Sequence, residues 1–294
     1  MSHHILHVFK HGCVLSKDRG FLVCKGEDKS ENRIPHEDVR AVIIAARGVT
    51  LTSHFVSAIM ETDGIILHCN ESYQPCGVTA PLGRVVDSRA YLHQAERPVR
   101  LNNRLWQHIL RGKTVNQLKV LKKRNLSSAH LELAIRQDSF DEGNCARRYW
   151  QLYFPSIGWA ASGRERKEVN APNQMLNYGY AVLAALCHRS LLIHGLTPLL
   201  GVKHTTRYHA DPLVYDLMEP FRPAVDLLLA EFMIGEDIEM RAWTKKVGTE
   251  LRERRVMHDR FSIKLMDAID ASANSLARSY SEKSDKLFWV PELE

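Results

Sequence analysis

The chain has 294 residues, of which 45% are hydrophobic and 25% are charged, a composition typical of a globular protein with one large or two ordinary domains. It contains no run of eighteen uninterrupted apolar residues, and its first residues lack the layout of a signal peptide, so we expect a cytoplasmic protein without a membrane span. Six scattered cysteines without a CxxC pair argue against a disulfide framework and a structural zinc site. The formal net charge of +6 mildly favours a polyanionic partner.

The first part of the chain has the pattern of a small β-domain. Short apolar runs, HILHVF, GFLVC, AVIIAA and GIILHC, are separated by turn-forming segments such as KDRG and GEDKSEN. One helix is expected within this domain, because Thr52 or Ser53 can cap the run HFVSAIMET. The apolar residues of that run fall on one helical face; they are Phe55, Val56, Ile59 and Met60.

After residue 85 the apolar spacing becomes helical and remains so. Helices are predicted over residues 87–112, 114–124, 127–138, 142–154, 173–194, 211–234 and 257–281. The longest irregular connection covers 155–172, and connections of that length are usually functional or mobile. We therefore predict an α+β protein with a small N-terminal β-domain over 1–84 and a larger all-α domain over 85–294.

One stretch of the helical part carries charge of a single sign. Between Arg97 and Leu131 there is no acidic residue, whereas nine residues are cationic. These are Arg97, Arg100, Arg104, Arg111, Lys113, Lys119, Lys122, Lys123 and Arg124. A solvated helix face normally mixes signs, so the run favours phosphate contacts with nucleic acid, although a basic surface or a dimer face remains open.

The segment 201–229 combines apolar density with acids and prolines. Asp211 is a residue type that is preferred at a helix N-cap, and Pro212 is a type that is preferred at the first helical position. Within the helix that follows, three carboxylates share a sector of roughly 80° on a helical wheel; they are Asp216, Glu219 and Asp226. A buried carboxylate must be protonated, paired with a cation or bound to metal. Pro220 and Pro223 are expected to bend the helix so that its acids face one site.

Two further residues complete a candidate metal site. His204 precedes the helix in a Gly-led loop, and Glu142 begins another helix in FDEGNCARRYWQLYF. Together with Glu219 they would form an oxygen-rich site with one nitrogen ligand, which suits Mn²⁺ or Mg²⁺ and phosphoryl transfer. The alternative is a solvated or salt-bridged acidic face.

Four motifs in order carry a family resemblance: EGNCARRYW, MLNYGYAVLAA, GLTPLLGVKH and DLMEPFRPAVD. In this order and spacing they resemble the CRISPR-associated spacer-acquisition integrase. IPHEDVRAVII, VTLTSHFVSAI and GIILHCN are similar to that family's N-terminal β-domain, so the resemblance covers most of the chain. The length and the segment DLMEPFRP look most like the type II branch.

The resemblance implies roles for individual residues. The family's metal ligands fall on Glu142, His204 and Glu219, and Asp216 matches an acid that supports the site. Many relatives have two adjacent histidines where this chain has Lys203 and His204; this departure leaves the ligand triad intact and puts the family's local phosphate contacts in question. The implied reaction is metal-dependent attack of a DNA 3′-hydroxyl on a phosphodiester at the CRISPR repeat boundary, with no covalent protein intermediate.

Further residues are candidates for DNA contact. The set comprises Arg84, Arg89, Arg104, Arg111, Lys119, Lys122, Lys123, Tyr149, Asn177 and Lys203. A core role is the alternative for Tyr149, and a helix-packing role is the alternative for Tyr180 in MLNYGY. Asp226 is interpreted as a partner of an arginine such as Arg222 rather than as a ligand.

The resemblance also implies partners in a prokaryotic cytoplasm. They are a homodimer formed through the β-domain, a dimer of the smaller CRISPR adaptation protein flanked by two such homodimers, and, for the type II branch, the effector nuclease and a further adaptation protein. Three alternatives stay open at the level of sequence. One is a metal-dependent nuclease acting on branched or single-stranded DNA, the second is a catalytically silent DNA-binding scaffold, and the third is a transposon-borne relative of the integrase.

Overall fold

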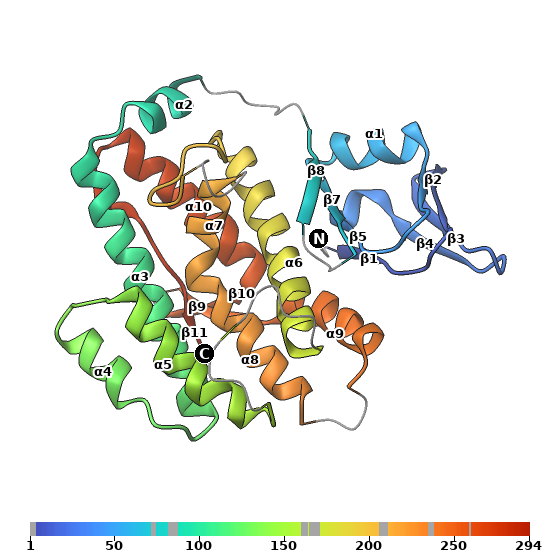
Figure 1. Cartoon of the computed structure of the whole chain (residues 1–294). Helices are drawn as coiled ribbons and strands as arrows, with labels where there is room; N and C mark the ends of the chain where they lie inside the picture. The colour runs from blue at the N-terminus through green and yellow to red at the C-terminus, as the bar shows by residue number, and fades with distance from the viewer. Residues whose placement is uncertain are drawn as a thin grey trace.

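The structure is a computed structural model that describes residues 4–71, 75–81, 88–159, 164, 171–205, 211–234, 238–258 and 260–294. A β-rich N-terminal part and a larger helical part lie side by side (Figure 1). The mixed α+β class is therefore confirmed. The predicted domain boundary near residue 84 falls outside the described residues.

Two four-stranded sheets form the N-terminal part. The first has the order β1 (His4–Val8), β5 (Val39–Ile44), β7 (Ile65–Cys69) and β8 (Pro75–Thr79), with β1, β5 and β7 parallel and β8 antiparallel to β7. The second has the order β4 (Glu31–Pro35), β3 (Phe21–Lys25), β2 (Val14–Asp18) and β6 (Thr50–Leu51). A short 3₁₀ helix, η1 (His36–Asp38), joins β4 to β5.

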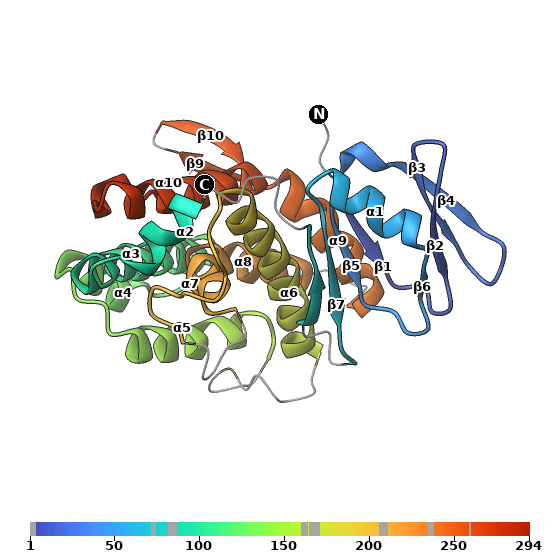
Figure 2. The ribbon, with the colours of Figure 1, turned by 90° about the horizontal axis from the view of Figure 1, so that it is seen from above.

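Strand β5 is apolar along its length because both of its faces are covered. Its alternate residues Val42 and Ile44 pack into a small core between the sheets, whereas Ala41 and Ile43 pack into the main core with the helices. Figure 2 shows helices α6 (Ala171–Ile193) and α9 (Met240–Glu253) between the first sheet and the rest of the helical part. The two parts of the chain thus share one hydrophobic core.

The helix expected in the β-rich part is α1 (Ser53–Glu61). Thr52 is its N-cap, and Thr52 Oγ1 accepts a hydrogen bond from the Phe55 amide at 3.2 Å. Phe55 and Ile59 are buried in the small core, and Val56 and Met60 pack against it. The predicted cap and apolar face are confirmed.

The helical part is built around α6, most of which is buried. The other helices are α2 (Ser88–Ala95), α3 (Val99–Lys123), α4 (Ala129–Arg136), α5 (Glu142–Ser156), α7 (Pro212–Met218), η2 (Glu219–Phe221), α8 (Arg222–Phe232), α9, α10 (Leu265–Ser281) and η3 (Asp285–Leu287). A small antiparallel sheet completes it, with the order β10 (Phe261–Lys264), β9 (Arg255–His258) and β11 (Glu292–Leu293). The prediction of an all-α second domain is therefore wrong in this detail.

The predicted helix boundaries also need correction. The break expected at residue 113 is absent, and the chain instead breaks before Val99, where Pro98 is the N-cap of a continuous α3. The helix predicted from 257 begins at Leu265, because β9 and β10 form a hairpin before it. Helix α9 was not predicted. No helix among the described residues is long and apolar enough to cross a membrane.

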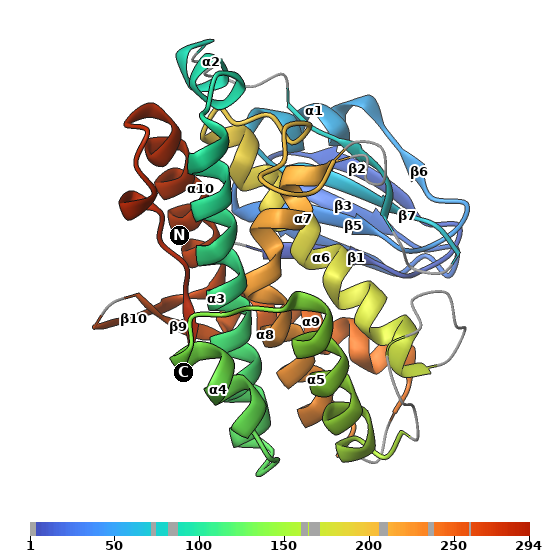
Figure 3. The same cartoon turned by 60° about the vertical axis from the view of Figure 1, so that its left-hand side comes forward.

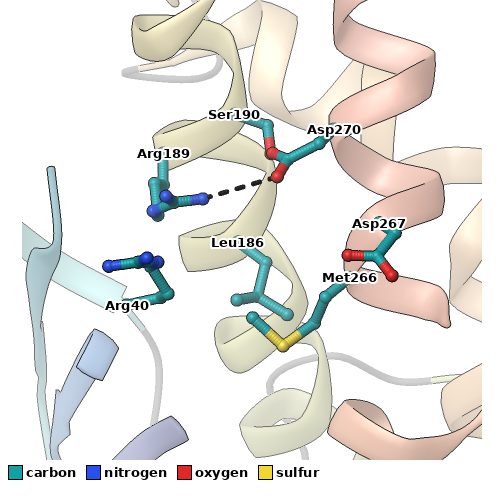
Figure 4. A pocket seen from close by; sticks show the side chains of 7 residues that line it. All are labelled: Arg40, Leu186, Arg189, Ser190, Met266, Asp267 and Asp270. Carbon is teal, nitrogen blue, oxygen red and sulfur yellow. Dashed lines mark hydrogen bonds and ion pairs between the residues drawn. The ribbon is translucent and has the colours of Figure 1, made fainter. Parts of the chain in front are cut away.

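Charged groups join the first sheet to the helices around a cavity of about 200 Å³ (Figure 4). Arg40 of β5 donates to the carbonyls of Glu37 and Thr62, while Arg189 of α6 donates to the Asp63 carbonyl at 2.9 Å. Arg189 also lies 3.6 Å from a carboxylate oxygen of Asp270 in α10. The contacts of Arg189 link α6 to the loop before β7 and to α10, whereas those of Arg40 link β5 to η1 and to the end of α1.

Candidate metal centre

Three elements bring two of the predicted metal ligands, Glu142 and Glu219, to the ammonium of one lysine, Lys113. Helix α3 lies beside α5 and beside the α7–η2–α8 segment (Figure 3). Glu142 is the first residue of α5, preceded by Asp141 as N-cap, whose carboxylate accepts from the Asn144 amide at 3.1 Å. A glutamate in this first turn is favoured by the helix dipole and leaves its carboxylate at the helix end.

The segment predicted as one helix over 211–234 is divided into α7, η2 and α8. Asp211 and Pro212 begin it as expected, and the division occurs at Glu219, with Pro220 and Pro223 each near the start of the next element. Proline lacks the amide hydrogen that a continuous helix would use, which accounts for the change of helix type here. Glu219 is thereby turned toward α3, and Asp226 lies in a separate cluster.

Lys113 of α3 lies between the two glutamates. Its Nζ atom is 3.1 Å from Glu142 Oε1 and 2.7 Å from Glu219 Oε2. The side chains of Lys113 and Glu219 are only 14% and 5% exposed, whereas that of Glu142 is 45% exposed. One ammonium therefore bridges a buried carboxylate and a half-exposed one.

Glu219 is surrounded by positive charge. Its Oε1 atom accepts from Arg222 Nε at 2.8 Å, three residues along the chain. Burial raises the pKa of Glu219, but Arg222, Lys113 and His204 outweigh that effect and lower it to about 2. Likewise, burial disfavours the charged form of Lys113, but Glu219 and Glu142 raise its pKa overall. The pair is fully ionised at neutral pH.

Asp216 is fully buried and holds the loop that carries His204. Its Oδ2 atom accepts from the amides of Val202 at 2.6 Å and Lys203 at 3.0 Å. Its Oδ1 atom accepts from the His204 amide at 3.2 Å and from His204 Nδ1 at 2.7 Å. Because an ionised carboxylate only accepts, Nδ1 carries the proton and Nε2 keeps the lone pair that a metal ligand requires. The supporting role predicted for Asp216 has a geometric basis.

The donor set fits a divalent cation. Two carboxylates and one imidazole are oxygen-rich ligands of the kind used for Mg²⁺ and Mn²⁺. Among the described residues no three acidic, histidine or cysteine side chains converge closely enough to form a finished site. Glu219 Oε2 is buried and its close contact with Lys113 lacks hydrogen-bond geometry. The residues fit the metal, and Lys113 occupies the space between two of them.

Asp226 lies in a buried cluster of tyrosines next to this centre. Its Oδ2 atom accepts from the Tyr149 hydroxyl at 2.8 Å, Oδ1 accepts from the Tyr180 hydroxyl, and its backbone carbonyl accepts from Tyr153 at 2.7 Å. Tyr149 is fully buried, so its candidate role as a DNA contact is wrong and the core alternative holds. The hydrogen-bond partners of Asp226 are tyrosines rather than the arginine that was expected.

The buried Asp226 gives a pH-dependent prediction. Burial raises its pKa to about 6, although the hydroxyls of Tyr180 and Tyr149 partly offset this. A carboxyl group in the unfolded chain has a pKa near 3.9, so the native state binds more protons between about pH 4 and 6 and loses stability as the pH rises through that window. For the variant Asp226→Asn, the unfolding free energy relative to wild type should rise by about 2 kcal/mol from pH 4 to pH 7 and be level above that. Urea denaturation at four pH values measures this difference, and a constant difference would contradict the assignment.

The cations of α3 are mostly paired with acids from distant segments. The pairs are Arg104 with Asp285, Arg111 with Asp138, Lys119 with Glu292, and Lys122 with Glu132. Arg97 and Arg124 donate to the backbone carbonyls of Gly201 and Ser156. The surface around α3 therefore carries both positive and negative charge, although the charged residues in this stretch of the sequence are all cations.

The remaining DNA-contact candidates differ in exposure. Arg89, Lys123 and Lys203 are exposed, and Asn177 is half-buried with its Oδ1 accepting from Arg164 at 2.9 Å. Arg84 lies outside the described residues.

Neither the role of Lys113 at the centre nor the Arg222–Glu219 pair was predicted from the sequence. The i, i+3 spacing of that pair is a sequence signal that was available.

Comparison with known proteins gives the family. The profile described as CRISPR associated protein Cas1 matches residues 6–258. The CRISPR-associated endonuclease Cas1 of Neisseria meningitidis serogroup C (strain 8013) is 30% identical over 295 residues, covering 97% of this chain and 95% of the relative. A solved casposase bound to integration product superposes with a TM-score of 0.81 at 19% identity, covering 97% of this chain and 92% of that one. A chain of a Cas6-RT-Cas1–Cas2 complex gives a TM-score of 0.74 at 17% identity, covering 98% of this chain and 36% of that one. The two structures agree with the fold, and the profile and the Neisseria relative show that the chain belongs to the CRISPR-associated Cas1 family.

Proposed function

We propose that the protein is a CRISPR adaptation integrase that joins a DNA 3′-hydroxyl to a phosphodiester at the repeat boundary by transesterification. The observation that carries the proposal is the convergence of Glu142 and Glu219 on one position, beside a histidine oriented by Asp216. The names of relatives add support, because the Neisseria relative is called an endonuclease and the casposase is described with integration product.

Glu142, Glu219 and His204 would hold Mg²⁺ or Mn²⁺. Such an ion, when bound, supplies a lowered pKa for the attacking hydroxyl and stabilises charge on the target phosphate. Two neighbouring residues would orient the ligands for this ion. Asp216 keeps His204 Nε2 available as an acceptor, and Arg222 holds Glu219 Oε1 so that Oε2 is the oxygen presented to the site.

DNA would be held mainly through its phosphates. Exposed cations such as Arg89, Lys123 and Lys203 are candidate contacts. The paired cations Arg104, Arg111, Lys119 and Lys122 are also candidates, because ion pairs near the surface are weak and a phosphate can replace the carboxylate. Binding of this kind should fall steeply with salt and show little dependence on sequence.

Partners follow from the family and remain part of the proposal. One solved neighbour belongs to an assembly that includes a Cas2 protein, which is consistent with a small adaptation protein as a partner of this chain. We extend this to a homodimer through the N-terminal β-domain over 1–84, and to the type II effector nuclease with a further adaptation protein. The helical domain over 85–294 would carry the chemistry.

Metal removal tests the proposed reaction. Purified protein, with and without the small partner, is mixed with labelled DNA bearing a free 3′-hydroxyl and a supercoiled plasmid containing a CRISPR repeat. We expect label to enter the plasmid in Mn²⁺ or Mg²⁺ and not in excess EDTA, while gel-shift binding of the DNA persists in EDTA. Joining that is equal in EDTA would contradict a metal-dependent integrase.

The second candidate is a metal-dependent nuclease without joining activity, favoured by the endonuclease name of the Neisseria relative. The same assay separates the two, because a nuclease gives shortened DNA and no labelled plasmid even when the partner is present. DNA binding without either product would favour a scaffold.

A further inference from the structure

The position of Lys113 has a consequence for metal binding. Its ammonium lies 3.1 Å and 2.7 Å from oxygens of Glu142 and Glu219, the two carboxylates that would ligate the ion. A cation held by both carboxylates would compete with Lys113 for Glu219 Oε2, because Glu219 Oε1 already accepts from Arg222. We propose that Lys113 is an internal counter-ion of the metal-free centre, which a divalent cation displaces when it binds. This inference rests on the proposed metal site.

The burial of the centre shows why an internal counter-ion is needed. The Glu219 side chain is only 5% exposed, and leaving its charge in place without a cation would be strongly destabilising. Arg222 neutralises the Oε1 side, and within the described residues the ion-pair partner of Oε2 is the Lys113 ammonium. Lys113 thus neutralises both carboxylates and keeps them from repelling one another until an ion binds.

The side chain of Lys113 can move away from the two carboxylates. The residue lies in the middle of α3, so its backbone is fixed by the helix, whereas its flexible side chain can move the ammonium without moving the helix. Glu142 is 45% exposed at the start of α5, which gives an entering ion access from solvent on that side. By contrast, the guanidinium of Arg222 is held by Glu219 at 2.8 Å and stacks over the Tyr180 ring at 4.7 Å. Of the two cations that contact Glu219, Lys113 is therefore the one that the metal ion displaces.

Displacement lowers the affinity for metal, because the ion must replace a favourable contact rather than fill an unneutralised site. Lys113→Met removes the charge and keeps an unbranched apolar stem. We expect this variant to bind Mn²⁺ about tenfold more tightly than wild type, since a buried ion pair no longer has to be broken. In EDTA its thermal midpoint should fall by about 5 °C, because Glu219 then lacks one of its two counter-ions.

The experiment is Mn²⁺ titration by calorimetry on the full-length protein, paired with thermal unfolding in EDTA and in 1 mM Mn²⁺. The rise in midpoint caused by Mn²⁺ should be larger for Lys113→Met than for wild type. Lys122→Met is the matched control, because Lys122 is on the same helix but pairs with Glu132 at the surface, and its Mn²⁺ affinity should equal that of wild type. Lys113→Arg retains the charge and should retain weak binding.

His204→Ala separates this inference from the proposed function. If Mn²⁺ binding to wild type does not depend on His204, both the metal site and the role of Lys113 are overturned. If binding depends on His204 but Lys113→Met binds Mn²⁺ equally or more weakly, only the displacement is overturned, and Lys113 is a fixed part of the loaded centre. Should Lys113→Met fail to fold, Lys113→Gln, which is also uncharged but can donate a hydrogen bond, is titrated in its place under the same criteria.

Discussion

Glu219→Gln is expected to reduce strand joining at least about 1,000-fold while gel-shift DNA binding changes little, because the substitution removes the charge of a proposed metal ligand and preserves its shape. Glu219 is the most buried of the three candidate ligands, with 5% of its side chain exposed against 26% for His204 and 45% for Glu142. Although burial raises its pKa, the neighbouring Arg222 and Lys113 lower that pKa overall and so favour its charged form. Loss of Mn²⁺ binding in calorimetry should accompany the loss of joining. Retention of near-normal joining by folded Glu219→Gln would contradict the assignment of the centre.

A folding defect has to be separated from this chemical effect. Glu219→Gln leaves Lys113 and Arg222 without their buried counter-charge, which should cost about 3–5 kcal/mol of unfolding free energy. Adding Lys113→Met removes one of those two cations, so the double variant should recover much of the stability but none of the joining. Glu231→Gln is the matched control in α8, since Glu231 pairs with Arg254 while 42% exposed and should change stability by less than about 1 kcal/mol. Recovery of joining in the double variant would show that Glu219 acts only through stability.

The elements predicted well from the sequence are those in which local signals agree. Thr52 followed by apolar residues at helical spacing gave α1, and that helix lies where it was expected. The continuous apolar run of β5 has its explanation in the two covered faces, with Val42 turned to one core and Ile43 to the other. Both signals depend on neighbours within a few residues.

Tertiary pairing accounts for the failures. The sequence of α3 predicts a phosphate-binding surface because it contains no acid, but the acids that pair with its cations come from other elements, at Asp138, Asp285 and Glu292. The order of charges along one helix does not reveal partners from other elements, whether they are 27 positions away, as Asp138 is from Arg111, or 181 positions away, as Asp285 is from Arg104. Likewise, no sequence pattern links Tyr149 with Asp226, because the two residues are 77 positions apart. They nevertheless form a buried hydrogen bond in the fold.

The candidate centre was located by family motifs rather than by periodicity. The motifs predict Glu142, His204, Asp216 and Glu219, and the structure brings these residues to adjoining elements, whereas the catalytic role itself stays a prediction. Lys113 was grouped with the DNA-binding cations because nothing local distinguishes it from Lys122. Only the packing of α3 against α5 and η2 makes one lysine internal and the other external.

Asp216→Asn is expected to lower strand joining by about 100-fold and to lower the thermal midpoint by several degrees. Each carboxylate oxygen of Asp216 accepts from two donors, the Val202 and Lys203 amides on Oδ2 and the amide and ring of His204 on Oδ1. An asparagine replaces one of those oxygens with an NH₂ group. Whichever way the amide is turned, two donors then face another donor instead of an acceptor.

Comparing His204→Ala with Asp216→Asn distinguishes a residue that binds the metal from one that only orients the metal ligand. His204→Ala removes the proposed ligand but leaves the three backbone hydrogen bonds of Asp216 in place, so it should abolish joining with a nearly unchanged thermal midpoint. Asp216→Asn should lower both quantities, and raising Mn²⁺ should restore part of its activity, because His204 remains present but is poorly oriented. Asp211→Asn is the control at the start of the same helix, since Asp211 makes no side-chain cap hydrogen bond there. If Asp216→Asn joined DNA as well as Asp211→Asn does, the imidazole would not need the buried carboxylate, and the orientation of His204 would have to come from its contacts with Trp106 and Tyr215 instead.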